Sequence, residues 1–236
     1  AAKSSKEMQI ALNIAARDAN RERYKFNTDK TKTVVVNIKK EPSLLINSKP
    51  LQISSKESHL GISRSAKNNN CDTVKGRVQS ARAAAFSLMG AGLHGLNGTG
   101  PEVASIQYSN TYVIPTLLYG LEALVLSDSE VQVLSAYHKK TLRYIQHLPQ
   151  STATPALFFL MGVLPVEAQL DIKTLTFFRN AVAADVKTPP AIYMQELLLR
   201  QLAIKDEDSS SWVNHVKHLA RKYDLPSPYE IALNPP

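Results

Sequence analysis

The sequence is poor in cysteine, and this scarcity excludes one class of fold. A single cysteine, Cys71, occurs among 236 residues, which rules out an internal disulfide framework and is typical of a reducing compartment. No uninterrupted run of 18 or more apolar residues is present, and no charged-then-apolar leader opens the chain. We therefore expect no membrane partner and an intracellular location, either nuclear or cytoplasmic.

Common catalytic motifs are also missing. The sequence contains no glycine-rich phosphate loop, no H-E-x-x-H and no G-x-S-x-G. His215 and His218 stand at a spacing that suits a metal ion, but no cysteine or carboxylate cluster accompanies them. The acidic run Asp206, Glu207 and Asp208 is typical of a solvated turn. We predict no metal ligands and no cofactor in this chain.

Positive charge is plentiful and unevenly distributed. The net charge is +8. Residues 1–62 carry 12 Lys and Arg against 6 Asp and Glu, residues 63–165 carry 8 against 5, and residues 166–236 carry 8 against 9. This asymmetry predicts a polyanionic partner for the first two segments. A lysine-rich solvated surface would give the same balance, so charge leaves both interpretations open.

The hydrophobic pattern changes character near residue 70. Residues 4–24 repeat apolar side chains at helical spacing, with Ser4 or Ser5 as the N-cap. Short strands follow at residues 33–36, 44–46, 51–53 and 58–62, the first with both faces buried. Beyond residue 70 the apolar positions step by three and four. The predicted class is α+β, with one helix on a small antiparallel sheet, then a helical bundle and a helical tail.

The helical part divides at its glycine and proline residues. We predict a long amphipathic helix over residues 72–88, a break at the glycines of residues 90–100, and Pro115 as the boundary between two further helices. The later helices are expected at residues 101–114, 116–125, 128–148, 153–161, 165–186, 191–204 and 211–223.

Three blocks of this helical part carry a family resemblance. They are His94-Gly95-Leu96-Asn97-Gly98, Val113-Ile114-Pro115-Thr116-Leu117-Leu118-Tyr119-Gly120-Leu121-Glu122, and Lys139-Lys140-Thr141-Leu142-Arg143-Tyr144-Ile145-Gln146-His147-Leu148-Pro149. Together they resemble the thumb of reverse transcriptases from non-LTR (LINE-type) retrotransposons. The resemblance implies three segments: the end of the palm at residues 1–62, the thumb at 63–165 and post-thumb helices at 166–236.

The same resemblance implies a function with its chemistry missing. In that family the metal-binding aspartates lie just before a segment like Ala2-Lys3-Ser4-Ser5-Lys6-Glu7, and the aspartates of residues 1–62, Asp18 and Asp29, are not paired. We expect a C-terminal fragment of an RNA-directed DNA polymerase that grips template–primer RNA and DNA and is inactive alone. Magnesium and the N-terminal part of the polymerase would then belong to the complete enzyme. The alternative is a stand-alone helical module, derived from a retroelement, that binds nucleic acid or protein.

Lys30 is the one candidate for a catalytic role. The stretch Asn27 to Thr31 resembles the family's Asn-x-x-Lys-Thr, in which the lysine lies near the triphosphate and is proposed to protonate the leaving pyrophosphate. A cation at that place stabilises developing charge and can act as a general acid. By the residues alone a plain turn lysine is the favoured interpretation, and any catalytic role requires the complete enzyme.

His59, Leu60 and Gly61 resemble the family's primer grip, an aromatic-Leu-Gly turn that holds the 3′ end of the primer. A histidine stands here in place of the more usual tyrosine, with less stacking area. A glycine at the edge of a strand explains the same residues without a ligand.

A basic stripe is predicted on the helix at residues 128–148. Lys139, Arg143 and His147 are four apart and would line one face, flanked by Lys140 and Tyr144. Cations with an interleaved aromatic ring suit a phosphate backbone, whereas an exposed amphipathic face would look the same. Arg77 and Arg82, on the helix at residues 72–88, suggest a second basic contribution.

Overall fold

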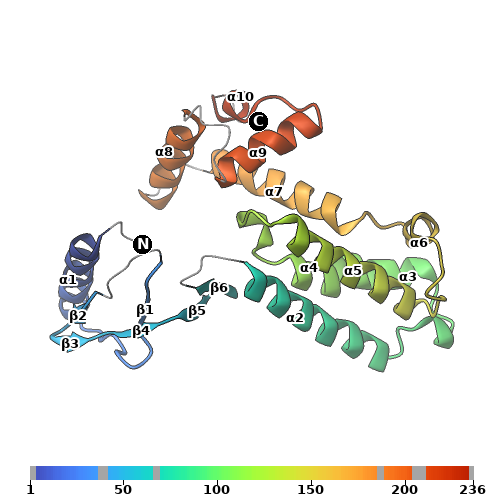
Figure 1. The fold of residues 1–236 in the computed structure, drawn as a ribbon, viewed down its shortest axis with the longest axis horizontal. Helices are drawn as coiled ribbons and strands as arrows, with labels where there is room; N and C mark the ends of the chain where they lie inside the picture. The colour runs from blue at the N-terminus through green and yellow to red at the C-terminus, as the bar shows by residue number, and fades with distance from the viewer. Residues whose placement is uncertain (1–3, 37–41, 66–69, 185–188, 204–210, 234–236) are drawn as a thin grey trace. The chain divides into compact units, whose positions relative to one another are not determined.

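The structure of the chain is a computed structural model that describes residues 4–36, 42–65, 70–184, 189–203 and 211–233. It divides into two compact units, Ala1–Thr73 and Val74–Pro236. Figure 1 shows the order of the elements along the chain. Every strand of the described residues ends by Ser65, and helices dominate afterwards. The predicted α+β class, with small sheets first and a helical bundle next, is confirmed.

The first unit opens with the predicted helix. Helix α1 spans Ser5–Arg21, and the side chain of its N-cap, Ser4, accepts a hydrogen bond from the Glu7 N–H at 3.2 Å. This bond satisfies one of the backbone donors that a helix start leaves unpaired. The buried residues Ala16 and Ala19 mark the face that α1 turns inward.

The described residues contain six short strands, and these form three two-stranded sheets and not the single antiparallel sheet that the sequence predicted. The strands are β1 (Lys32–Val34), β2 (Leu45–Ile46), β3 (Lys49–Pro50), β4 (Gln52–Ser54), β5 (Lys56–His59) and β6 (Ile62–Ser65). The pairs β2–β3 and β5–β6 are antiparallel, whereas β1 and β4 pair in parallel. The connection over residues 35–51 is long enough for the crossover that parallel strands need.

Strand β1 is also less buried than the sequence predicted. Its residues are exposed or half-buried, and Val36 beyond it is 37% exposed. A three-residue strand in a two-stranded sheet has too few neighbours to be covered on both faces. Lys32, at the start of β1, forms an ion pair with Glu57 at 2.9 Å. The hydrogen bond from Lys32 lowers the pKa of the Glu57 carboxyl.

The core of the first unit lies where α1 covers the β2–β3 hairpin. Its buried residues are Ala16, Leu44, Ile46 and Leu51. The Gln9 amide ties the same surfaces together, because its Nε2 donates to the Leu45 carbonyl at 2.8 Å and its Oε1 accepts from the Leu45 N–H at 2.9 Å. One side chain thus completes the backbone pairing of an edge strand.

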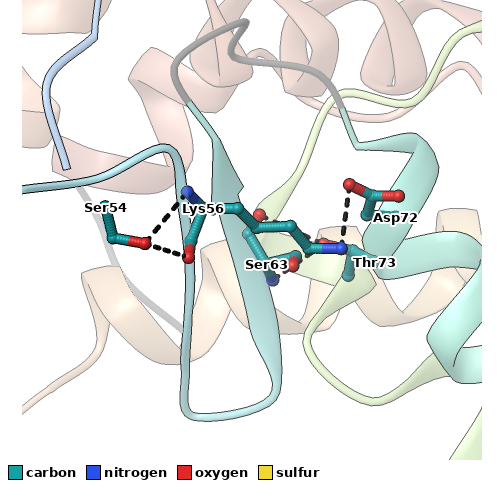
Figure 2. A network of polar contacts seen from close by, with 5 residues as sticks. All are labelled: Ser54, Lys56, Ser63, Asp72 and Thr73. Atoms are coloured by element: carbon teal, nitrogen blue, oxygen red, sulfur yellow. Dashed lines mark hydrogen bonds and ion pairs between the residues drawn. The ribbon is translucent and has the colours of Figure 1, made fainter.

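Figure 2 shows how the β5–β6 hairpin is fastened to the first turn of helix α2 (Cys71–Gly90). The Thr73 hydroxyl accepts from the Ser63 N–H at 2.9 Å and donates to the Ser63 carbonyl at 3.3 Å. Lys56 Nζ lies 3.0 Å from Asp72 Oδ2. The Ser54 hydroxyl, in turn, donates to the Lys56 carbonyl at 2.7 Å. Because Thr73 is 2% exposed, its two hydrogen bonds are shielded from water.

The helices of the second unit follow the expected order. After α2 come η1 (Gly95–Asn97), α3 (Pro101–Ser105), η2 (Ile106–Tyr112), α4 (Val113–Leu118), η3 (Leu121–Ala123), α5 (Asp128–Ile145), α6 (Thr154–Met161), α7 (Val166–Val182), α8 (Pro189–Ala203), α9 (Trp212–Lys222) and α10 (Pro228–Leu233). The predicted acidic turn at residues 206–208 lies outside the described residues.

The prediction that Pro115 separates two helices is wrong. Helical backbone continues from α3 through the π-helical η2 into α4, and Pro115 is the third residue of α4. Proline has no backbone N–H group to donate. In the first turn of α4 this loss matters little, because the wider π-helical turns before it already interrupt the regular α-helical hydrogen bonds. The sequence rule therefore applies to the interior of a regular α-helix, and Pro115 does not lie in one.

Helix α5 buries one face in the bundle, although Val131 and Leu148, which continue the same spacing, are only half-buried. Ser127 and Glu130 form a capping box at its start. Leu134, His138, Thr141 and Ile145 are buried, as their three-and-four spacing predicts. The helix nevertheless ends at Ile145, three residues before the predicted end.

The C-terminal helices have a core of their own. It joins α7, α8 and α9 through the buried residues Phe178, Val182, Leu198, Leu202, Val213 and Val216. The indole Nε1 of Trp212 donates to the Glu122 carbonyl at 2.8 Å, which ties α9 to η3. Asp171 on α7 accepts from Lys222 Nζ at 2.6 Å and from the Tyr223 hydroxyl at 2.8 Å, and the contact with Asp171 raises the pKa of Lys222.

Candidate nucleic-acid interface

A groove between α2 and α5 gathers basic and aromatic side chains in the second unit. Its volume is about 360 Å³, and the two helices that form it lie side by side in Figure 1. The residues that line it are Arg82, Ala85, Phe86, Met89, Tyr137, Lys140, Thr141 and Tyr144. We call it the α2–α5 groove.

The floor of the α2–α5 groove is buried. Ala85, Tyr137 and Thr141 are each less than one-tenth exposed. The Thr141 hydroxyl donates to the Tyr137 carbonyl at 2.9 Å, within α5. Burial raises the pKa of the Tyr137 phenol, and the nearby charge of Arg82 opposes this shift. The floor is therefore an uncharged surface, and the charge of the groove belongs to its rim.

The rim carries one cation and one ring from each helix. Arg82 and Phe86 are four apart on α2, and Lys140 and Tyr144 are four apart on α5. Phe86 and Tyr144 are each 53% exposed and meet edge to face, with ring centroids 6.1 Å apart. Among the residues that the structure describes, neither Arg82 nor Lys140 has a carboxylate partner. Both positive charges are thus available to an anionic ligand.

Two histidines extend the rim beyond Tyr144. The His94 ring lies 6.0 Å from the Tyr144 ring and 5.9 Å from the His147 ring, between centroids. Nδ1 of His94 accepts the Leu96 N–H at 3.1 Å, so the proton of the neutral ring lies on Nε2. This hydrogen bond fixes the orientation of the His94 ring.

The lack of a side chain at Gly95 allows His94 and His147 to lie close together. A Cβ atom at residue 95 would lie 2.6 Å from the Gln146 carbonyl oxygen, so no other residue fits without a backbone shift. The close approach places the segment that carries His94 against the end of α5, next to His147. The glycine of the predicted thumb block thus has a packing reason in this structure.

The predicted basic stripe is only partly assembled. His147 lies beyond the end of α5 with a left-handed backbone, φ 54°, so the prediction that it shares a helical face with Lys139 and Arg143 is wrong. The helix ends early because the Leu148 N–H bonds back to the Arg143 carbonyl at 2.8 Å, as in a helix C-terminal motif. Lys139 is half-buried, whereas Lys140 is exposed on the groove rim.

The guanidinium of Arg143 forms its hydrogen bonds within the bundle. Its Nε and Nη2 atoms donate to the Thr152 carbonyl at 3.2 and 2.8 Å, and Nη2 also donates to the Thr154 hydroxyl at 3.2 Å. These bonds hold the connection between α5 and α6. The guanidinium therefore stabilises a loop and is a poor candidate for a phosphate contact.

The other predicted residues lie in the first unit. Lys30 is exposed in a turn built by Asn27, whose Oδ1 accepts from the backbone N–H groups of Asp29 and Lys30, both at 3.1 Å. His59 ends β5, and Leu60 and Gly61 form the two-residue turn of the β5–β6 hairpin. Leu60 is 72% exposed. The predicted single strand at residues 58–62 is therefore wrong, because the turn at Leu60 and Gly61 divides it between β5 and β6. The binding role of His59, Leu60 and Gly61 stays a prediction.

Sequence reasoning missed Phe86 and Tyr137. The available signal was a repeated pair, a basic residue followed four residues later by an aromatic ring, in Arg82–Phe86 and again in Lys140–Tyr144. Residues four apart share a helix face. Of the second basic contribution that the sequence suggested, Arg82 lines the groove, whereas the Arg77 guanidinium covers the Tyr119 ring at 4.7 Å.

The histidines of α9 do not assemble a metal centre in the described part of the chain. His215 is half-buried, and burial lowers its pKa, while His218 is exposed. No group of three or more His, Cys, Asp or Glu side chains that could hold a metal ion occurs among the described residues.

Comparison with protein-family models, with curated proteins and with solved structures gives no match for this chain. Within the described residues, no single helix is long and apolar enough to cross a membrane. Helices α6 and α7, bent by 55° at their junction, reach that length and composition only as a pair.

Proposed function

We propose that this chain binds nucleic acid, as the gripping C-terminal part of a non-LTR retrotransposon RNA-directed DNA polymerase. The observation that carries the proposal is the α2–α5 groove, where Arg82 and Lys140 stand beside Phe86 and Tyr144 without carboxylate partners among the described residues. The block resemblance to the thumb of that family supports the same function. The chemistry of the polymerase would require the rest of the enzyme.

The physical role of the groove follows from its two kinds of side chain. The cations of Arg82 and Lys140 attract phosphates and release counterions, which supplies affinity that depends on salt but not on sequence. The exposed rings add contact with bases or sugars. In the first unit, Lys30 and the turn at Leu60 would face the same ligand only in the complete enzyme.

A salt titration tests this proposal. For wild type, we expect the affinity for a fluorescent oligonucleotide to fall roughly tenfold or more between about 50 mM and about 200 mM salt. In the double variant Arg82→Ala and Lys140→Ala, the slope of log affinity against log salt should shrink by about 0.7 to 0.9 for each lost contact. Fluorescence anisotropy measures both values.

Lys173→Ala with Arg179→Ala is the matched control, because it removes the same charges from α7, outside the groove. The control variant should keep most of the wild-type slope. Equal losses from both double variants would show that the charge acts diffusely and would refute the groove. Lys139→Ala provides a further comparison, since this half-buried neighbour lies off the rim and should change the slope less than Lys140→Ala.

One observation favours a protein-interaction module as second candidate. Helix α8 exposes the large apolar side chains of Ile192, Tyr193, Met194, Leu197 and Leu199, and exposed apolar surface of this kind occurs at protein interfaces. This function predicts that the chain fails to bind oligonucleotides at low salt but self-associates in sedimentation velocity. Tyr193→Ser with Leu197→Ser would then abolish the association.

A further inference from the structure

We infer that the second unit prefers unpaired bases, so that the α2–α5 groove and its histidines bind single-stranded nucleic acid more tightly than duplex. This inference rests on the proposed function and names the form of its ligand. The feature that carries it is a row of four rings, Phe86, Tyr144, His94 and His147, which we call the ring row.

The ring row is continuous although its members come from separate segments. Phe86 lies on α2, Tyr144 on α5, His94 before η1 and His147 after α5. Successive ring centroids are 6.1, 6.0 and 5.9 Å apart. The first two contacts are edge to face, at interplanar angles of 79° and 87°, and the third is tilted at 49°. Each ring thus contacts the next one in the row.

Exposed ring surface is useful to a single strand and of little use to a duplex. Bases in a duplex stack on one another and show only their edges, whereas unpaired bases offer whole faces that stack on aromatic side chains. Phe86 and Tyr144 leave half of their surface open to solvent. Because edge-to-face contacts favour one orientation of these rings, stacking a base on them costs less additional ordering.

Charge complementarity identifies the occupant as a polyanion. Arg82 and Lys140 flank the Phe86–Tyr144 end of the ring row, and neither has a carboxylate partner among the described residues. An apolar protein helix laid on the rings would remove both cations from water without compensation, which is unfavourable. A single strand supplies a phosphate for each cation and a base for each ring.

Three probes of equal length separate stacking from charge. They are a fluorescent oligo-dT, the same backbone with abasic sites in place of the bases, and a hairpin duplex. Oligo-dT and its abasic counterpart share their phosphates and differ only in bases. We expect wild type to bind oligo-dT about tenfold or more tighter than the abasic strand, and tighter than the duplex.

Ring variants give the second arm. Tyr144→Leu and Phe86→Leu keep apolar volume but remove the flat faces, and each should weaken oligo-dT binding by about fivefold or more. Neither variant should change the affinity for the abasic strand. Tyr144→Phe keeps the ring and should bind like wild type. The fluorescence of Trp212, the single tryptophan, verifies that each variant retains the fold of the second unit.

The outcomes are distinct. Equal affinity for oligo-dT and the abasic strand, or tighter binding of the duplex, overturns the preference for unpaired bases and leaves the proposed function standing. If no probe binds at low salt, both the inference and the proposed function fail.

Discussion

His138 is fully buried in α5, between the rings of Tyr108 and Phe158. Neither of its ring nitrogens has a hydrogen-bond partner among the described residues. Burial lowers the pKa of this imidazole to about 4, against the attraction of Glu167. The folded chain therefore holds His138 neutral at a pH where an unfolded chain would already be protonated.

This burial predicts a specific loss of stability in acid. As the pH falls below about 6.5, the unfolded state takes up a proton on His138 before the folded state does. The stability of the second unit should decline by about 3 kcal/mol by pH 4, where both states become protonated. Urea unfolding of wild type and His138→Phe at several pH values checks this.

His138→Phe should lack the part of the acid-induced stability loss that His138 causes. The exposed His218→Phe is the control and should retain it. Parallel pH curves for wild type and His138→Phe would contradict a neutral buried histidine.

Leu60 is a second residue that should lower the stability of the chain by a measurable amount. It occupies the hairpin turn with φ 51°, followed by Gly61 at φ 75°, a conformation in which Asn-Gly is the favoured pair. A leucine there loses about 1 kcal/mol relative to a residue suited to the left-handed region. Leu60→Asn should raise the stability of the first unit by that amount, measured by thermal unfolding.

Leu60→Ala should bring no such gain, because alanine has the same steric conflict with a left-handed backbone. Strained, exposed residues often persist where they serve a ligand. A primer-grip role for Leu60 would therefore appear as weaker binding in the stabilised Asn variant, measured in the complete enzyme.

At the scale of elements, the first turn of α2 fixes the β5–β6 hairpin (Figure 2). Thr73→Val removes the hydroxyl that serves both backbone groups of Ser63, and leaving them unpaired should cost about 1 to 3 kcal/mol. Thr73→Ser retains the hydroxyl and should cost much less. Hydrogen exchange at the Ser63 amide reports the local effect.

The neighbouring ion pair should contribute less. Lys56 and Asp72 remain about half exposed, so Asp72→Asn should change stability by less than about 1 kcal/mol. A larger effect from Asp72→Asn than from Thr73→Val would mean that charge, and not the buried hydroxyl, fastens the hairpin.

The elements were predictable wherever local sequence decides them. Leu134, His138, Thr141 and Ile145, the buried face of α5, follow the general three-and-four spacing expected beyond residue 70, because one helix period determines it. The π-helical stretch before Pro115 was not predictable, since the spacing rules that predict helices do not distinguish π-helical from α-helical turns. The parallel pairing of β1 with β4 depends on a contact distant in sequence.

The candidate site divides in the same way. Lys140 and Tyr144 were named from their helix, and Arg82 from the other. The hydrogen bonds of Arg143 could not be predicted, because its partners Thr152 and Thr154 follow an intervening turn. A charged residue in a stripe looks equally available to a ligand until its nearest carbonyl is known.

For the whole molecule, two units predict two unfolding events. The first unit has a small core of Ala16, Leu44, Ile46 and Leu51, whereas the second buries many large side chains. Trp212 reports only on the second unit, and far-UV circular dichroism reports on both. In urea we expect the dichroism to begin changing before the fluorescence, so the transitions should not coincide. A single shared midpoint for the two signals would show that the chain unfolds as one cooperative body.

The contact of Gly95 with Gln146 has a consequence for selection. If residue 95 were randomised and the library screened for binding to a single strand, glycine alone should be recovered, although residue 95 itself need touch no ligand. An invariant position in such a screen would then mark the backbone clearance that sets the distance between two histidines. Selection for binding would then retain glycine at residue 95 because any larger residue would push the backbone away from Gln146.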